Sequence, residues 1–292
     1  MAKTRAEIRR EVASTFGAGI AVVQTTTEGS ENTFTDERRL NDEDTYYAGA
    51  DIVITSGDPG TNLNEVRLIV NSERVSATVT VTPNWNEIPV LGTTAEIYNL
   101  HGMDATVPEW NGFINQAIAE AASLTASVPK TVSLGTFTAD SWYASDDENI
   151  AGAQQSLPIP AGIDWAGPVT FVKSGRTYYP DRGGQFTGEG WRIDDVHRRV
   201  ILSGDLVHDA DGAAFYLRGW GPPEEMYTDQ DTTTIPPIWL YAKVKALVYA
   251  RVQEKGLFDL RGEATKWEGI AQNAQRLLRP GEFPPNTVRV WS

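Results

Sequence analysis

The sequence predicts an α+β fold in which short helices form the core and two antiparallel β modules are attached to it. Three observations lead to this prediction. Capping-box patterns at Thr4 and Thr106 each precede apolar residues at helical spacing. After each of these segments, runs of β-branched residues alternate with polar and turn residues. From about residue 236 the chain returns to a helical pattern.

These patterns divide the chain into six segments. They are an N-terminal helix (1–19), a small β-barrel or sandwich module (20–105), a central helix (106–126), a second β region (127–235), a C-terminal helix hairpin (236–280) and an extended docking tail (281–292).

The first two helices are predicted from their caps and their apolar faces. Thr4 and Glu7 have capping-box spacing, as do Thr106 and Glu109. The apolar positions that follow recur every three or four residues, which is the period of a half-buried helix. They are Ile8, Val12, Ala13 and Phe16 in the first helix, and Trp110, Phe113, Ile114, Ala117, Ile118 and Ala121 in the second.

The strands are predicted from short β-branched runs bounded by turn residues. In the first module they are expected at 21–23, 51–55, 66–70 and 75–81. Over 75–81 apolar and polar residues alternate, so one face of that strand should be buried. In the second region the strands are expected at 170–172, 190–193, 199–202 and 214–218.

The C-terminal part is predicted to be an antiparallel helix hairpin followed by a docking tail. The helices are expected at about 238–255 and 260–278, with Pro280 and Gly281 ending the second. The tail ends in strand-like alternation. An aromatic side chain at a chain end contributes no stability unless it packs on this subunit or on a neighbour. The candidate partner-docking residues are therefore Val288, Arg289, Val290 and Trp291.

Composition excludes several classes of protein. The chain has no cysteine, which removes disulfides, thiol catalysis and thiolate metal sites. No run approaches the roughly 20 apolar residues of a membrane span, and the N-terminus lacks the pattern of a secretory signal. The net charge of −14 argues against a protein that wraps DNA.

The charge is unevenly distributed along the chain. Residues 1–12 carry a net charge of +2 and residues 236–292 of +4, so the body between them carries −20. Two interpretations stay open. The acidic body serves solubility, or it repels DNA and faces a basic partner.

We find no residues that form a catalytic, cofactor-binding or metal site. No two of His101, His197 and His208 have metal-ligand spacing. The acidic stretches 146–148 and 208–212 favour polar loops over cation sites. The glycines of 183–190 precede a predicted strand and no lysine accompanies them, so a phosphate loop is not expected.

Nine tryptophans are many for this length, and two interpretations are open. They could form a carbohydrate-stacking surface, or they could be core anchors. We favour core anchors for Trp110, Trp191, Trp220, Trp239 and Trp267.

The order of these elements resembles the head-to-tail adaptor (connector) proteins of long-tailed phages. One stretch that carries the resemblance runs from Tyr47 through 57–60 and 66–69 to the close Val79-Thr80-Val81-Thr82-Pro83-Asn84-Trp85 and Pro89. Others are 190–193 with 199–202 and 216–219, and 229–237 with the helix after it.

The resemblance implies a virion protein that is not an enzyme and binds no cofactor. Such proteins form a ring, commonly of twelve subunits, beneath the portal, and they are assembled in the host cytoplasm. The implied partners are further copies of the chain, the portal protein, the next neck or tail protein and, transiently, the genomic DNA that passes through the lumen. Deletion of 282–292 is then expected to abolish joining but to leave a folded monomer.

Three other functions stay open. The chain could be a different neck or tail component, such as a stopper, tail-completion or baseplate protein. It could be a glycan-binding tail module with exposed aromatic side chains in a cleft. It could also be a hydrolase, which would need two close carboxylates with one of them in an apolar pocket.

Overall fold

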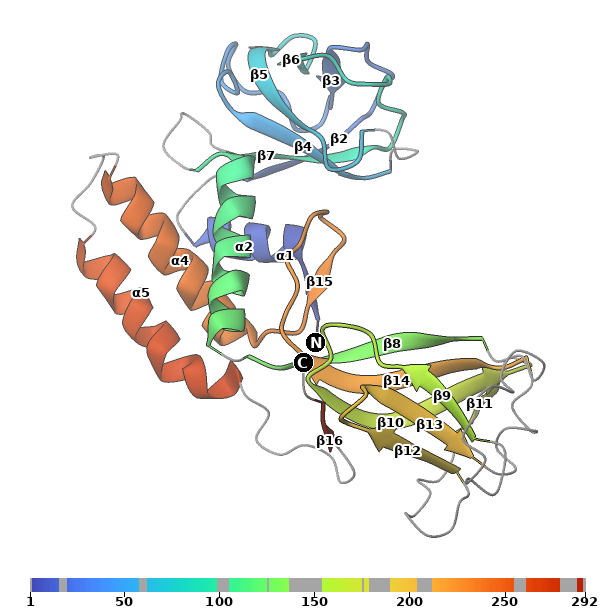
Figure 1. Ribbon diagram of the computed structural model, residues 1–292. Helices are drawn as coiled ribbons and strands as arrows, with labels where there is room; N and C mark the ends of the chain where they lie inside the picture. Colours follow the sequence, from blue (N-terminus) through green and yellow to red (C-terminus); the bar gives the residue numbers. More distant parts are fainter. Residues whose placement is uncertain are drawn as a thin grey trace. The chain divides into compact units, whose positions relative to one another are not determined.

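The structure is a computed structural model that describes residues 2–15, 20–57, 62–98, 105–124, 126–136, 154–174, 176–178, 190–203, 212–254, 261–278 and 288–290 (Figure 1). The chain forms two compact units. Unit 1 consists of Met1–Ala121 and Glu224–Arg276, and unit 2 of Ala122–Pro223 and Leu277–Ser292. The chain therefore leaves unit 1, enters unit 2, and returns to each of them once.

Unit 1 contains a curled antiparallel sheet of six strands in the order β2-β7-β4-β5-β6-β3. The strands are β2 (Ala21–Gln24), β3 (Thr33–Thr35), β4 (Asp51–Ser56), β5 (Val66–Glu73), β6 (Thr78–Thr82) and β7 (Thr94–Tyr98). A hydrogen bond from the Thr26 amide to the Thr35 carbonyl (3.1 Å) joins the ends of the two edge strands. The concave side is closed around a core that includes Phe34, Ile52, Ile54, Ile69, Val79 and Ile97, all fully buried.

The helices described in unit 1 are α1 (Arg5–Ser14), α2 (Val107–Ser123), α4 (Pro237–Glu254) and α5 (Arg261–Ala274). Both predicted capping boxes are present. Glu7 N–H donates to Thr4 Oγ1 (3.2 Å), and Glu109 N–H donates to Thr106 Oγ1 (3.3 Å). Strand β1 (Lys3–Thr4) precedes α1, strand β15 (Thr232–Thr233) precedes α4, and the two strands pair with each other.

Unit 2 consists of two antiparallel sheets that share one core. The first contains β8 (Val128–Thr136), β10 (Trp165–Lys173), β11 (Arg176–Tyr178), β14 (Ala214–Gly221) and β16 (Val288–Arg289). The second contains β9 (Gln154–Pro158), β12 (Gly190–Asp194) and β13 (Arg199–Ser203). Phe171, Phe215 and Leu217 of the first sheet pack in one cluster with Val200 and Leu202 of the second. A short 3-10 helix, η3 (Gln275–Leu278), follows α5.

The predicted fold class, with its helical core, is wrong. The described residues are mostly β and only 28% helical, and the two cores named above are made by residues of strands and of the loops next to them. Several strands contain residues that are uncommon in strands. Strand β7 carries the buried charge of Glu96, and β8 contains Pro129, Lys130 and Gly135. The sequence patterns therefore predicted fewer strands than the structure contains.

One predicted strand is also displaced. Val75 was expected to lie on the buried face of a strand, but its side chain is fully exposed (101%). The chain reverses here, and Ala77 has a positive φ of 48°. Strand β6 begins only at Thr78, and the expected burial is found at Val79 and Val81.

Candidate functional site

A buried ion network is the main polar feature of unit 1. Arg9 of α1 donates from both terminal nitrogens to Asp229, with distances of 2.8 Å and 2.6 Å. Arg5, one helical turn earlier, donates from Nε to the same carboxylate at 2.9 Å. The side chains of Arg9 and Asp229 are 0% and 1% exposed, so this carboxylate is shielded from water on all sides.

The same helix also binds the convex side of the curled sheet. Glu96 of β7 is fully buried and accepts from Arg10 Nε at 2.7 Å, and Arg9 Nη2 lies 3.8 Å from its other oxygen. The Tyr98 hydroxyl donates to Glu96, and the Arg9 guanidinium lies over the Tyr98 ring, 5.1 Å from its centre. Alternation explains the arrangement, because Ala95 and Ile97 point into the core while Glu96 and Tyr98 point out of it.

Helix α2 and the segment that follows β14 complete the network. Asn111 accepts from Arg9 (2.8 Å), and Asn115 exchanges two hydrogen bonds with the backbone of Met226 (2.9 Å and 3.0 Å). Asp51 of β4 accepts from the Val107 amide at the start of α2 (2.8 Å). Charged and amide groups therefore connect strands and helices of unit 1 in addition to their apolar contacts.

The electrostatics of the network indicate a structural role. Burial alone would raise the pKa of Asp229, but hydrogen bonds and charge from Arg9, then Arg5, hold its pKa below the usual value. Burial likewise opposes the charge of Arg9, and the hydrogen bonds to Asp229 outweigh it, so the pKa of Arg9 is raised. Because both groups stay charged and neither is exposed, they are not available for proton transfer.

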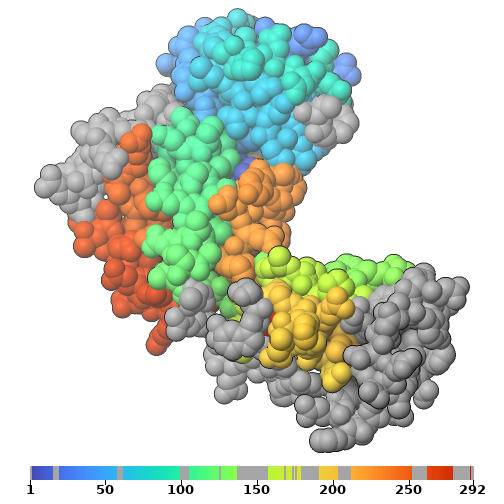
Figure 2. Space-filling view, viewed as in Figure 1, coloured from blue at the N-terminus to red at the C-terminus, as the bar shows by residue number. Residues whose placement is uncertain are grey.

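A second ion cluster connects three helices of unit 1. Lys243 of α4 is bound by Glu120 of α2 (2.6 Å) and by Glu268 of α5 (2.9 Å). Burial opposes the charge of Lys243, but the two carboxylates outweigh it and raise its pKa. In Figure 2 the surfaces of α2 (green) and α5 (red-orange) lie beside each other. The bridge fixes the spacing of these helices.

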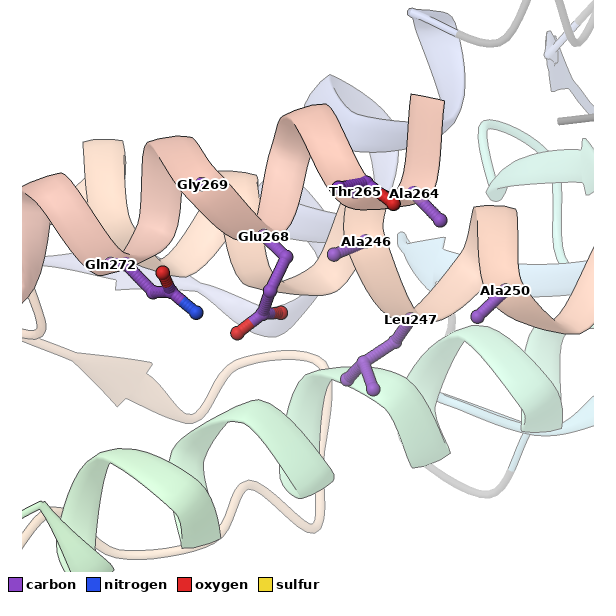
Figure 3. A pocket seen from close by; sticks show the side chains of 8 residues that line it. All are labelled: Ala246, Leu247, Ala250, Ala264, Thr265, Glu268, Gly269 and Gln272. Atoms are coloured by element: carbon purple, nitrogen blue, oxygen red, sulfur yellow. The ribbon is translucent and has the colours of Figure 1, made fainter. Parts of the chain in front are cut away.

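An open groove lies between α4 and α5 next to this bridge (Figure 3). Its volume is about 450 Å³, which is within the range of ligand pockets, roughly 300–1,000 Å³. We call it the α4–α5 groove. Its lining is apolar and small on both helices, with a few polar groups from α5: Ala246, Leu247, Ala250, Ala264, Thr265, Glu268, Gly269 and Gln272.

A loop of the curled sheet exposes three apolar side chains. Ile88, Val90 and Leu91 are 48%, 39% and 63% exposed, and they follow one another within four residues. We call residues 87–91 the apolar loop. Exposed apolar residues scattered singly are normal, and a loop that gathers three of them is a candidate contact surface.

The predicted docking residues lie partly in the chain's own sheet. Val288 and Arg289 form β16, which pairs with Ala166 and Trp165 of β10. Val290 donates from its amide to the Asp164 carbonyl (2.8 Å) and is 3% exposed in the core of unit 2. Trp291 is outside the described residues, and docking of this segment on a partner stays a prediction.

The other residues singled out from the sequence lie apart from one another or outside the described residues. His197 is exposed in a turn and contacts Asp194 (2.8 Å). His101 and His208, the acidic stretch 146–148 and the glycines of 183–189 lie outside the described residues. Trp110, Trp191 and Trp239 are buried, as expected for core anchors, and Trp220 and Trp267 are half-buried.

Sequence reasoning missed the ion network. A signal existed in α1, where Arg5 and Arg9 lie four residues apart on the same side as Ile8 and Val12. Charged residues on an apolar helix face need partners. No local pattern marks Asp229 as that partner, because 220 residues separate it from Arg9.

Comparison with known protein families found no matching family, and comparison with characterised proteins found no match. Within the described ranges, no cluster of histidine and carboxylate side chains is suited to hold a metal ion. In the same part of the chain, no helix is both long enough and apolar enough to cross a membrane.

Proposed function

We propose that this chain is a structural protein of a tailed-phage particle, an adaptor subunit that assembles with further copies into a ring beneath the portal. The ring would join the capsid to the next neck or tail protein and leave a passage for DNA. The observation that carries the proposal is the order of elements. It runs from α1 through the curled sheet and α2 to a second β region, and then to the α4–α5 hairpin and β16. The same order underlies the resemblance to adaptor proteins.

One of the motifs that carry the resemblance, the close from Val79 to Pro89, lies in unit 1. Trp85 is 3% exposed in the core of the curled sheet, and its amide donates to the Glu31 carbonyl (2.6 Å). The Arg67 guanidinium covers its ring at 5.4 Å. Pro89, at the end of the motif, is buried between exposed neighbours. The motif therefore supports the apolar loop, which suits a protein that works by contact.

The buried charges also favour a structural role over hydrolysis. A glycoside hydrolase needs one carboxyl kept protonated in an apolar pocket and a second that reaches the substrate. Two of the three buried carboxylates of the network, Asp229 and Glu96, instead contact the arginines of α1 and have no exposed surface toward a substrate. Burial raises the pKa of the third, Asp51, but its carboxylate accepts from the Val107 amide at the start of α2.

The test is assembly on a portal. The chain is mixed with the portal protein encoded by the same genome, and the products are examined by electron microscopy and by mass measurement of the complex. We expect a ring of this chain attached to the portal. If the chain stays monomeric under these conditions, or if it cleaves a glycan or peptide substrate, the proposal is wrong.

A further inference from the structure

The apolar loop is held firmly although its side chains are exposed. The Val90 carbonyl accepts from Thr25 Oγ1 (2.6 Å) and from the Thr93 amide (3.1 Å), and the Gly92 amide donates to the Thr25 carbonyl (3.1 Å). At the other end, Asn62 Nδ2 donates to the Glu87 carbonyl (2.8 Å). A contact surface that is ordered before binding loses little conformational entropy on binding. The loop therefore holds Ile88, Val90 and Leu91 in place before any partner binds.

The α4–α5 groove has the complementary chemistry and shape. Leu247 and the alanines of both helices make its wall apolar, and no heavy atom lies within 4 Å of a Cβ built on Gly269. Its one charged lining residue, Glu268, is paired with Lys243 at 2.9 Å, and Lys243 also binds Glu120. The groove can therefore accept aliphatic side chains without burying an unpaired charge.

Charge complementarity indicates that the occupant is a second copy of this chain. Residues 20–105, which carry the apolar loop, contain four basic residues against fourteen acidic ones, a net charge of −10. Residues 237–278, which form the groove, contain seven basic against four acidic residues, a net charge of +3. Two exposed basic side chains of this segment are already paired, Lys266 with Glu263 (3.2 Å) and Arg251 with Glu109 of α2 (3.9 Å), so the complementarity rests on the net charges of the two segments. Opposite charges of this kind favour contact between the two surfaces of different copies.

We infer that the apolar loop of one copy binds in the α4–α5 groove of the next copy. This contact joins two different surfaces, so it is heterologous, and repetition closes a ring if the rotation per subunit allows it. The inference rests on the proposed function, because it names the partner surface through which the ring would form. It involves unit 1 alone.

Disulfide trapping tests the contact directly, because the chain contains no cysteine of its own. Two single variants, Leu91→Cys and Gly269→Cys, are mixed under mild oxidation. We expect a cross-linked dimer to form at least about tenfold faster than in the control mixtures, since docking raises the local thiol concentration. The controls replace one partner each: Val75→Cys, fully exposed elsewhere on the curled sheet, and Gly262→Cys, elsewhere on α5. Equal rates in all mixtures would overturn the inference.

A second experiment blocks the contact and then restores it. Leu91→Asp removes the loop anchor, and Gly269→Leu fills the groove, while Val75→Asp and Gly262→Leu are matched controls on the same elements. In sedimentation and portal-binding assays, each of the first two variants alone should fail to form rings, and the controls should assemble like the wild type. Mixed together, Leu91→Asp and Gly269→Leu should form a dimer that grows no further, because one intact loop and one intact groove remain.

The outcomes separate this inference from the proposed function. If Leu91→Asp and Gly269→Leu form normal rings on the portal, the inference is wrong and the adaptor role stands. If the wild type forms no ring with the portal, the adaptor role is wrong and the inference falls with it.

Discussion

At the scale of single residues, two glycines show how the surroundings decide the effect of one methyl group. Gly112 lies in α2, and nothing is within 4 Å of the position that a Cβ would take. Gly221 ends β14, and a Cβ there would lie 1.8 Å from the Gly162 carbonyl oxygen. The first glycine weakens a helix without a packing reason, and the second permits a close approach of two backbones.

We therefore predict opposite effects for Gly112→Ala and Gly221→Ala. The first should raise the free energy of unfolding of unit 1 by about 0.5–1 kcal/mol, which is the cost of glycine within a helix. The second should destabilise unit 2 by about 1–3 kcal/mol or more, because backbone atoms must move apart. Denaturant titration followed by hydrogen exchange assigns each change to its unit. Changes of the same sign would contradict the prediction.

Arg9 offers a second prediction at this scale. Replacement by methionine in Arg9→Met leaves Asp229 and Glu96 buried with fewer partners, and breaking a buried ion pair from one side costs about 3–5 kcal/mol. Denaturant unfolding measures the loss. The control is Arg38→Met on the exposed surface, which should leave the unfolding midpoint unchanged. A stable Arg9→Met variant would mean that the network contributes no stability.

The same network gives unit 1 a defined response to acid. Arg9 and Arg5 lower the pKa of Asp229, so the folded state binds this proton less tightly than the unfolded state does. The resulting stability is present above the usual carboxyl pKa of about 4 and is lost as the pH falls through the lowered pKa. Unfolding midpoints measured between about pH 2 and pH 7 should show this loss. In Asp229→Asn this part of the pH dependence should be missing.

At the scale of elements, β16 shows how a short segment becomes part of a core. It pairs with β10 over two residues, and most of the stability that this segment contributes comes from the buried side chain of Val290, the next residue. From the sequence, deletion of 282–292 was expected to leave a folded monomer. In the structure this deletion removes Val290, which is a residue of the unit 2 core. Burial of one valine is worth about 1.5–3 kcal/mol.

Truncation after residue 287 should therefore destabilise unit 2 by roughly that amount and leave unit 1 unchanged. Hydrogen exchange at Trp165 and Ala166 of β10 is the direct measurement, because these residues lose β16 while β10 keeps β11 and β14. The variant Val290→Leu, which keeps an apolar side chain at the same place, should retain most of the protection. Equal protection of β10 in the truncated chain would show that β16 is dispensable.

At the scale of the whole molecule, the charge distribution should govern assembly. Residues 20–105 of one copy (net charge −10) and residues 237–278 of another (net charge +3) attract one another, and salt screens this attraction. Raising sodium chloride from about 0.1 M to about 1 M shortens the screening length from about 10 Å to about 3 Å. Ring formation should weaken several-fold over this range. Assembly that is independent of salt would point to a purely apolar interface.

How far the sequence predicted this molecule depends on the range of the interactions involved. The helix caps at Thr4 and Thr106 are local and were predicted correctly. The strand β9 pairs with β13, more than forty residues away, and its own residues give no clear pattern. Arg9 and Asp229 are further apart still. Local periodicity indicates elements, whereas partners across such distances are set by the complete fold.

The separation of Arg9 from Asp229 also affects how the chain is made. A ribosome adds roughly 5–20 residues per second, so α1 emerges roughly 10–40 s before the carboxylate that neutralises it. During that interval Glu96 and Asn111 emerge, but the guanidinium still lacks Asp229, the carboxylate that it contacts most closely. Unit 1 can close only late in translation, and unfinished chains stay exposed to chaperones and proteases until then.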